Sequence, residues 1–179
     1  MAGGYVRHRS RMVARSVYDD AKAVLDANGW TVEPAIGLLD VGEIVTFLDY
    51  FPEQPEGDGD RLPINTLALD LGTAEQPYEY ELGGLFAQEY TFNFAFNARN
   101  DAIAMALFSD LADHYLGRTG EGFIALRNYV TAPPVTVVTM EVERFETAKS
   151  TEQAAPGVHL WFSQLVVTDY LDQVRAANP

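Results

Sequence analysis

Two segments of the chain repeat their apolar residues at helical spacing. In the first, Asn28-Gly29 follows the repeat as a stop signal, which predicts a helix over residues 11–28. In the second, Asn100-Asp101 offers a helix cap and Gly117 a stop, which predicts a helix between them. The two apolar stripes are Val13, Val17, Ala21, Val24 and Leu25, and Ile103, Leu107, Leu111 and Tyr115.

Alternation of apolar and polar residues predicts strands elsewhere. The clearest case is residues 90–97, where Tyr90, Phe92, Phe94 and Phe96 point one way and small or polar side chains the other. Four aromatic side chains at this spacing predict a core face. The other predicted strands, the first preceded by a loop over 30–43, are 44–50, 64–71, 123–126, 135–145 and 160–171.

The last predicted strand, residues 160–171, is apolar on both faces. Such a strand is either central and covered twice, or covered on one side by a neighbouring subunit. The second alternative makes Trp161 and Leu165 candidate residues of a subunit interface. The two faces carry Leu160, Phe162, Val166 and Tyr170, and Trp161, Leu165, Val167 and Leu171.

Length and composition predict one globular domain. The chain has 179 residues, of which 47% are hydrophobic, enough for a single core over residues 13–172. Residues 173–179 are expected to form a short tail, and the acidic, Pro- and Gly-rich segment 51–63 a solvated loop. No apolar run approaches the roughly 18 residues of a membrane span, and no apolar segment follows the basic N-terminus as in a secretory signal. We therefore expect a soluble, unexported protein without a membrane partner.

Charge is distributed unevenly along the chain. The net charge is −14, yet the N-terminal arm, residues 1–12, is basic and holds Arg7, Arg9 and Arg11. Residues 23–60 contain no Lys or Arg. Because DNA affinity depends on Lys and Arg replacing counterions, the acidic body argues against sequence-specific DNA binding. The arm is either a frayed terminus or a segment ordered by an acidic partner, so its arginines are candidate partner contacts.

Catalytic and metal-binding patterns are missing from the sequence. There is no cysteine, and His8, His114 and His159 are far apart without the spacing of a zinc site. Acidic residues in 56–60 resemble the start of a calcium loop, but Arg61 stands where that loop needs glycine. No GxSxG or Walker pattern occurs. We therefore expect no catalytic, cofactor-binding or metal-binding residues, and no enzyme.

The order of elements and several local phrases resemble the tail terminator (tail completion) proteins of long-tailed bacteriophages, particularly phages of actinobacterial hosts. The resemblance covers residues 13–171. The phrases that carry it are NTLALDLG (65–72), EYELGGL (79–85), YTFNFAFNARNDAIAMAL (90–107), IALRNY (124–129) and HLWFSQLVVTDYL (159–171).

This resemblance implies an α+β fold, a single domain with a mostly antiparallel β-sheet flanked by two main α-helices. It implies a structural virion protein at the head-tail junction, assembled in the host cytoplasm. Members form a ring, commonly a hexamer, that caps the head-proximal end of the tail tube and stops its polymerisation. The implied partners are other copies of the chain, the tail-tube protein and the head-side connector or stopper protein, while DNA passes through the ring.

Two other functions fit the same sequence. A head-side neck or connector-completion protein is also small, ring-forming and non-enzymatic, and binding to tube protein would separate it from a terminator. A small acidic enzyme or carbohydrate-binding module would instead present the aromatic residues of 90–97 to a ligand. The latter requires that aromatic face to be exposed.

Overall fold

The structure is a computed structural model, and its helices and strands lie in eight described segments. They are residues 9–33, 44–48, 66–74, 78–81, 85–98, 100–117, 122–150 and 159–172. The predicted loop at 51–63, the tail at 173–179 and Arg7 lie outside them.

Two helices and eight strands make up these segments. The helices are α1 (Arg9–Ala27) and α2 (Asp101–Tyr115). The strands are β1 (Thr31–Glu33), β2 (Ile44–Leu48), β3 (Thr66–Ala74), β4 (Tyr78–Glu81), β5 (Leu85–Ala98), β6 (Phe123–Asn128), β7 (Val135–Lys149) and β8 (His159–Asp172).

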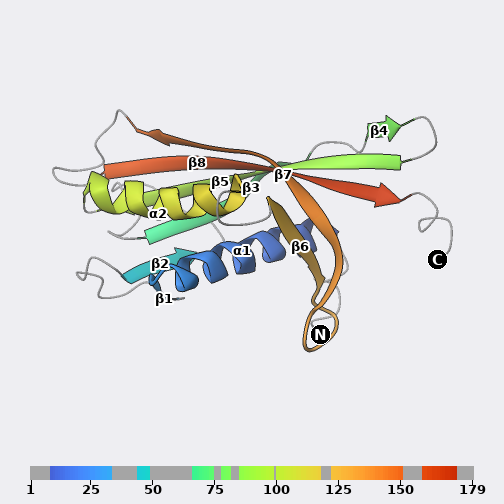
Figure 1. The fold of residues 1–179 in the computed structure, drawn as a ribbon, viewed down its shortest axis with the longest axis horizontal. Helices are drawn as coiled ribbons and strands as arrows, with labels where there is room; N and C mark the ends of the chain where they lie inside the picture. The colour runs from blue at the N-terminus through green and yellow to red at the C-terminus, as the bar shows by residue number, and fades with distance from the viewer. Residues whose placement is uncertain are drawn as a thin grey trace, which may run out of the picture.

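The strands form one curled sheet in the order β1-β2-β3-β5-β8-β7-β6, with β4 paired to the start of β5. Neighbours pair antiparallel along the part of the sheet that runs β3-β5-β8-β7-β6. At the other end, β1 pairs parallel with β2 and β2 pairs parallel with β3. Both helices lie on one face of this sheet (Figure 1). The predicted α+β fold, a mostly antiparallel sheet with two helices, is therefore confirmed.

The core lies between the two helices and the sheet. The aromatic face of β5 forms its centre, because Phe92, Phe94 and Phe96 are fully buried and Tyr90 is 1% exposed. Phe96 meets the ring of Phe108 on α2 edge to face, with centroids 6.2 Å apart. The predicted core face is confirmed, and it removes the exposed aromatic platform that a carbohydrate-binding module would need.

Both predicted helices are confirmed, and their ends follow local chemistry. The Asn100 side chain accepts a hydrogen bond from the backbone N–H of Ile103 at 3.0 Å, which caps α2. Gly117 follows α2 with a φ of +73°, a conformation that favours glycine. Helix α1 begins at Arg9, two residues before the predicted start at residue 11, so the end of the predicted arm belongs to this helix.

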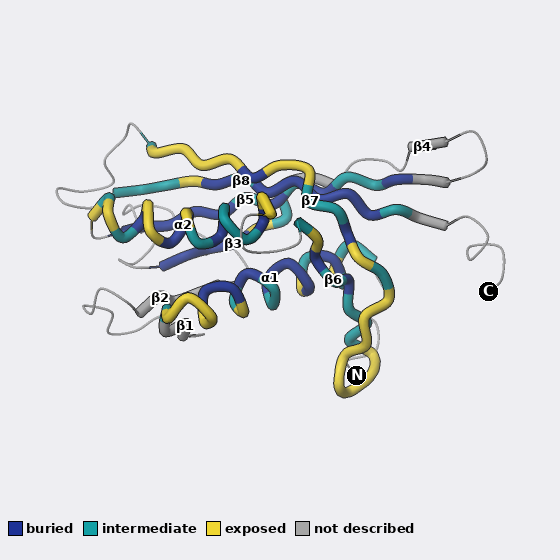
Figure 2. Tube along the Cα trace, in the orientation of Figure 1, coloured by how far each residue is buried: buried dark blue, intermediate teal, exposed yellow. Residues whose placement is uncertain are grey.

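Strand β7 changes partners along its length. Its first part, up to Glu141, pairs with β6, and its second part, from Glu141 to Lys149, pairs with β8. At this point β8 continues along β5 while β7 turns away with β6, so the β6–β7 hairpin projects from the body (Figure 1). Its yellow tip in Figure 2 is exposed.

Candidate functional site

The sequence-predicted interface residues Trp161 and Leu165 both point to the helix-covered side of β8. Leu165 is fully buried in the core, where it pairs across the sheet with Phe92 and Phe145. Its assignment to a subunit interface is therefore wrong. With two apolar faces on β8, alternation alone does not tell which face the helices cover.

Trp161 connects α2 to the sheet, and because it is only partly buried its assignment to a subunit interface stays a prediction. Its indole Nε1 donates to Asp101 Oδ1 at 2.9 Å, and Lys149 Nζ donates to Asp101 Oδ2 at 2.5 Å. His159 Nδ1 also lies 3.0 Å from Asp101 Oδ1. The hydrogen bond from Lys149, followed by that from Trp161, lowers the pKa of the Asp101 carboxyl. The first residue of α2 is thus tied to β7 and β8.

Two of the arginines predicted to contact a partner, Arg9 and Arg11, lie in the described part of the chain, on α1. Arg9 reaches across to Asp169 of β8, with Nη2 donating to Oδ1 at 2.7 Å and Nε donating to Oδ2. It forms an intramolecular ion pair while its side chain stays 39% exposed, so its assignment as a partner contact stays a prediction. Arg11 lies exposed on α1. Both described arginine candidates are thus accessible, Arg11 more than Arg9.

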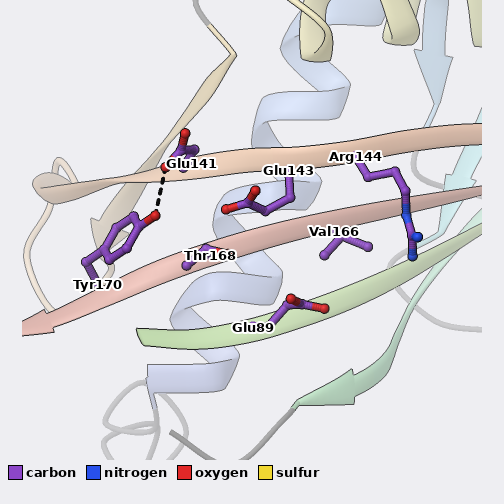
Figure 3. A pocket seen from close by; sticks show the side chains of 7 residues that line it. All are labelled: Glu89, Glu141, Glu143, Arg144, Val166, Thr168 and Tyr170. Atoms are coloured by element: carbon purple, nitrogen blue, oxygen red, sulfur yellow. Dashed lines mark hydrogen bonds between the residues drawn. The ribbon is translucent and has the colours of Figure 1, made fainter. Parts of the chain in front are cut away.

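The face of the sheet turned away from the helices carries an acidic hollow. Glu89 of β5, Glu141 and Glu143 of β7 and Tyr170 of β8 line it, together with Arg144, Val166 and Thr168. Figure 3 shows their side chains on neighbouring strands. A register shift between Val142 and Arg144 adds a residue to β7 here, which bends the strand. The hollow lies where β7 changes partners.

Side-chain hydrogen bonds connect neighbouring strands at this hollow. The Tyr170 hydroxyl donates to Glu141 Oε2 at 2.8 Å (Figure 3). Arg144 Nη2 donates to Gln164 Oε1 at 3.1 Å, and its Nε lies 3.6 Å from Glu146 Oε1. Three glutamates against one arginine give a local negative charge, which repels phosphate groups.

A second hollow on the sheet is nearly free of charge. Phe162, which is 42% exposed, is the one aromatic residue that lines it. Glu146 is the one charged residue among those that line it, which are Asn93, Glu146, Thr147, Ala148, Phe162, Ser163 and Gln164. The apolar face of β8 that the helices leave uncovered therefore includes Phe162, rather than the predicted Trp161 and Leu165.

The β6–β7 hairpin has apolar residues on both faces, and only one face is covered. Its inner face packs into the core through Ile124, Leu126 and Met140, all fully buried. Elsewhere the hairpin exposes apolar residues: Phe123 of β6 is 49% exposed, Val135 and Val137 of β7 are 57% and 42% exposed, and Val130 at the tip is 67% exposed. These four residues are called the hairpin patch below. A register shift gives β7 an extra residue here, so that Val135 pairs with Asn128.

Sequence reasoning did not single out the hairpin patch. A usable signal was present, because residues 128–140 contain no charged side chain in a chain of net charge −14. An exposed apolar patch without charge is typical of a protein-binding surface.

Within the eight described segments, no group of three His, Cys, Asp or Glu side chains is placed to hold a metal ion. Neither of the helices described, α1 or α2, is long and apolar enough to cross a membrane. His114 Nε2 lies 3.2 Å from Asp20 Oδ2, a pairing that links α2 to α1.

Comparison with known proteins adds no identification. No protein-family model matches the chain, and no curated protein matches it. The geometry of the hairpin patch and of the two hollows is therefore the basis for a functional proposal.

Proposed function

We propose that this chain is a structural virion protein, a tail terminator that forms a ring on the head-proximal end of a phage tail tube. In this role it stops tube polymerisation and joins the tail to the head-side connector or stopper protein. The observation that carries the proposal is the hairpin patch, a set of exposed apolar side chains on a hairpin that projects from an acidic body (Figure 1). The family resemblance of residues 13–171 supplies the identity of the partners.

A ring needs each subunit to offer surfaces that bind protein. Exposed apolar side chains on the hairpin and at Phe162 supply such surfaces in two separate places. Contacts between two different surfaces of one chain generate rings when the rotation closes. The resemblance implies six copies.

An acidic protein suits a conduit for DNA. The net charge is −14, and three of the acidic residues, Glu89, Glu141 and Glu143, line the acidic hollow on the helix-free face. Like charges keep the DNA backbone from binding to the wall while the molecule passes through. The proposed protein therefore handles DNA without sequence-specific contacts. It acts in the virion at the head-tail junction, without a cofactor or a catalytic step, after assembly in the host cytoplasm.

Electron microscopy of the purified protein, with and without tail-tube protein, tests the proposal. We expect rings at one end of each tube, together with tubes that no longer lengthen. A protein that leaves tube length unchanged and never decorates tube ends would refute the terminator function. Decoration of the connector alone, with no binding to the tube, would instead identify a head-side neck protein.

A further inference from the structure

The second half of β7 has one bare edge. β6 pairs with β7 only as far as Glu141, and the backbone N–H of Val142 still donates to the carbonyl of Gly122 at 2.9 Å. From Arg144 to Lys149 the strand pairs with β8 on one side, and no strand of the described segments pairs with its other side. This half of β7 lies along the upper border of the sheet in Figure 1 and is largely exposed in Figure 2. The sheet can therefore accept one more strand here.

The backbone groups that face the bare edge follow from the register with β8. The N–H of Ser150 donates to the carbonyl of Leu160 at 2.9 Å, so these two residues form a hydrogen-bonded pair. Hydrogen-bonded and non-hydrogen-bonded pairs alternate along an antiparallel ladder. The N–H and C=O groups of Phe145, Thr147 and Lys149 therefore point away from β8, toward the bare edge.

A side-chain contact supports this assignment. Thr147 and Ser163 are cross-strand partners, and their hydroxyl oxygens lie 2.6 Å apart. Such a close approach is typical of a non-hydrogen-bonded pair, whose backbone groups point outward. Among the described residues, none outside the β7–β8 ladder forms a backbone hydrogen bond with Phe145, Thr147 or Lys149. An added strand would pair these groups.

A second copy of β7 fits this edge in one register. If two copies run antiparallel with their Thr147 residues opposite each other, Phe145 of each copy lies opposite Lys149 of the other. Every outward N–H and C=O group then has a partner, and Glu146 lies opposite Ala148, so no like charges meet. A shift by two residues in one direction brings the two Glu146 side chains together, which is unfavourable. A shift in the other direction leaves Phe145 without a partner.

The charge of the edge segment also favours a second copy. Each copy has a net charge of −14, so copies repel each other where acidic surfaces meet. Residues 144–149 carry Arg144 and Lys149 against Glu146 alone, so this segment is not acidic. A second copy also brings an equivalent bare edge, so one contact pairs both edges. An extended peptide of another protein would pair only one.

We propose that two copies of the chain join through this edge, as an antiparallel β7–β7 pair centred on Thr147 that makes one continuous sheet. Both copies use the same surface, so the contact is two-fold and stops at a dimer. The paired segment is short, so the dimer belongs to the class of weak, concentration-dependent complexes. This dimer is a state of the free protein and does not depend on the proposed tail function.

Two substitutions at Thr147 test the contact. Thr147→Pro removes the N–H at its centre. Because that N–H points away from β8, and proline is tolerated at such positions of an edge strand, the monomer should keep its circular dichroism spectrum. The dimer affinity, measured by analytical ultracentrifugation over a concentration series, should fall at least about tenfold. Thr147→Val is the matched control, because it keeps the N–H and loses only the hydroxyl that meets Ser163, and it should dimerise like the unmodified protein.

Charges introduced at Ala148 test the register. Ala148 is exposed, and in the dimer it lies opposite Glu146 of the other copy. Ala148→Lys should therefore strengthen the dimer and Ala148→Glu should weaken it, by roughly fivefold in each direction. Met105→Lys and Met105→Glu, at a position 58% exposed on α2, change the net charge equally and control for general repulsion between copies. Their effects on the dimer should be smaller.

Three results would overturn the proposal. The first is an unmodified protein that stays monomeric at about 1 mM, where even a dimer of millimolar dissociation constant is populated. The second is a folded Thr147→Pro protein that dimerises like Thr147→Val. The third is a pair of Ala148 variants whose affinities differ no more than those of the Met105 variants, and this comparison decides alone if Thr147→Pro does not fold. Tube capping is scored separately, so a failed dimer leaves the tail function standing and a failed tail function leaves the dimer standing.

Discussion

Arg9 and Asp169 form a two-pronged ion pair across 160 residues of sequence, which fastens the start of α1 to the far part of β8. The Asp169 side chain is fully buried, whereas Arg9 is 39% exposed. The hydrogen bonds from Arg9 to Asp169 raise the pKa of the guanidinium further. Arginines in the first turn of a helix are disfavoured by its dipole, and the Asp169 carboxylate offsets that charge.

Removing Arg9 should therefore destabilise the protein strongly. Arg9→Ala leaves a buried carboxylate without its partner, and we expect the free energy of unfolding to fall by about 3–5 kcal/mol. Urea denaturation followed by circular dichroism measures this. Lys22→Ala is the control, because Lys22 pairs with Asp26 on the exposed side of the same helix and should change stability by less than about 1 kcal/mol. Equal effects of the two substitutions would show that the Arg9 pair is not buried in solution.

Two phenylalanines on opposite faces of the sheet give a second test. Phe94 is fully buried and meets the Phe145 ring edge to face, with centroids 6.1 Å apart. Phe94→Ala should lower the free energy of unfolding by about 3–5 kcal/mol. Phe162→Ala, at a position 42% exposed, should cost much less in the isolated subunit. The unfolding temperatures of the two variants are compared with that of the unmodified protein, at a concentration where the protein is monomeric.

Sequence reasoning correctly placed the strands that have one apolar and one polar face. In β5, aromatic residues alternate with small or polar ones, so Phe92, Phe94 and Phe96 were placed in the core correctly. Strand β8 has two apolar faces, so the pattern could not tell which one the helices cover, and Leu165 was misassigned. The three-residue strand β1 was missed because it depends on pairing with β2, which local sequence does not encode.

The assembly surfaces were harder to predict than the fold. The valines of 135–138 predict a strand whether or not a neighbour covers them. Their exposure arises because β7 leaves β8 at Glu141 and continues with β6 alone, a consequence of long-range pairing. The Arg9–Asp169 pair also depends on segments distant in sequence, so the basic composition of residues 1–12 suggested an arm.

Leu165→Glu should unfold the subunit rather than block assembly. The side chain is fully buried between Phe92 and Phe145, and an unpaired carboxylate there costs several kcal/mol. Circular dichroism should show loss of the folded signal at the temperature where Phe162→Asp retains it. A folded, monomeric Leu165→Glu protein would restore this residue to the subunit interface.

Buried tyrosines predict how stability responds to alkaline pH. Burial raises the pKa of Tyr90 to about 12, with a further increase from the nearby Asp169 charge, and burial raises the pKa of Tyr115 well above 10. Tyrosine is neutral below its pKa, so the folded protein holds these protons more tightly than the unfolded chain does. Their contribution to stability is therefore complete below about pH 10 and is lost as the pH rises through the folded values.

Unfolding midpoints measured from pH 8 to pH 12 check this dependence. We expect the midpoints to fall above about pH 10. The midpoint of Tyr90→Phe should fall less steeply, because this variant has lost one of the two hydroxyls with a raised pKa, those of Tyr90 and Tyr115. Tyr90→Phe also loses the hydrogen bond from its hydroxyl to Gln88 Oε1, 2.8 Å long, so its midpoint at pH 8 is the reference for its own series. Identical slopes for both proteins above pH 10 would show that Tyr90 titrates in the fold as it does in the unfolded chain.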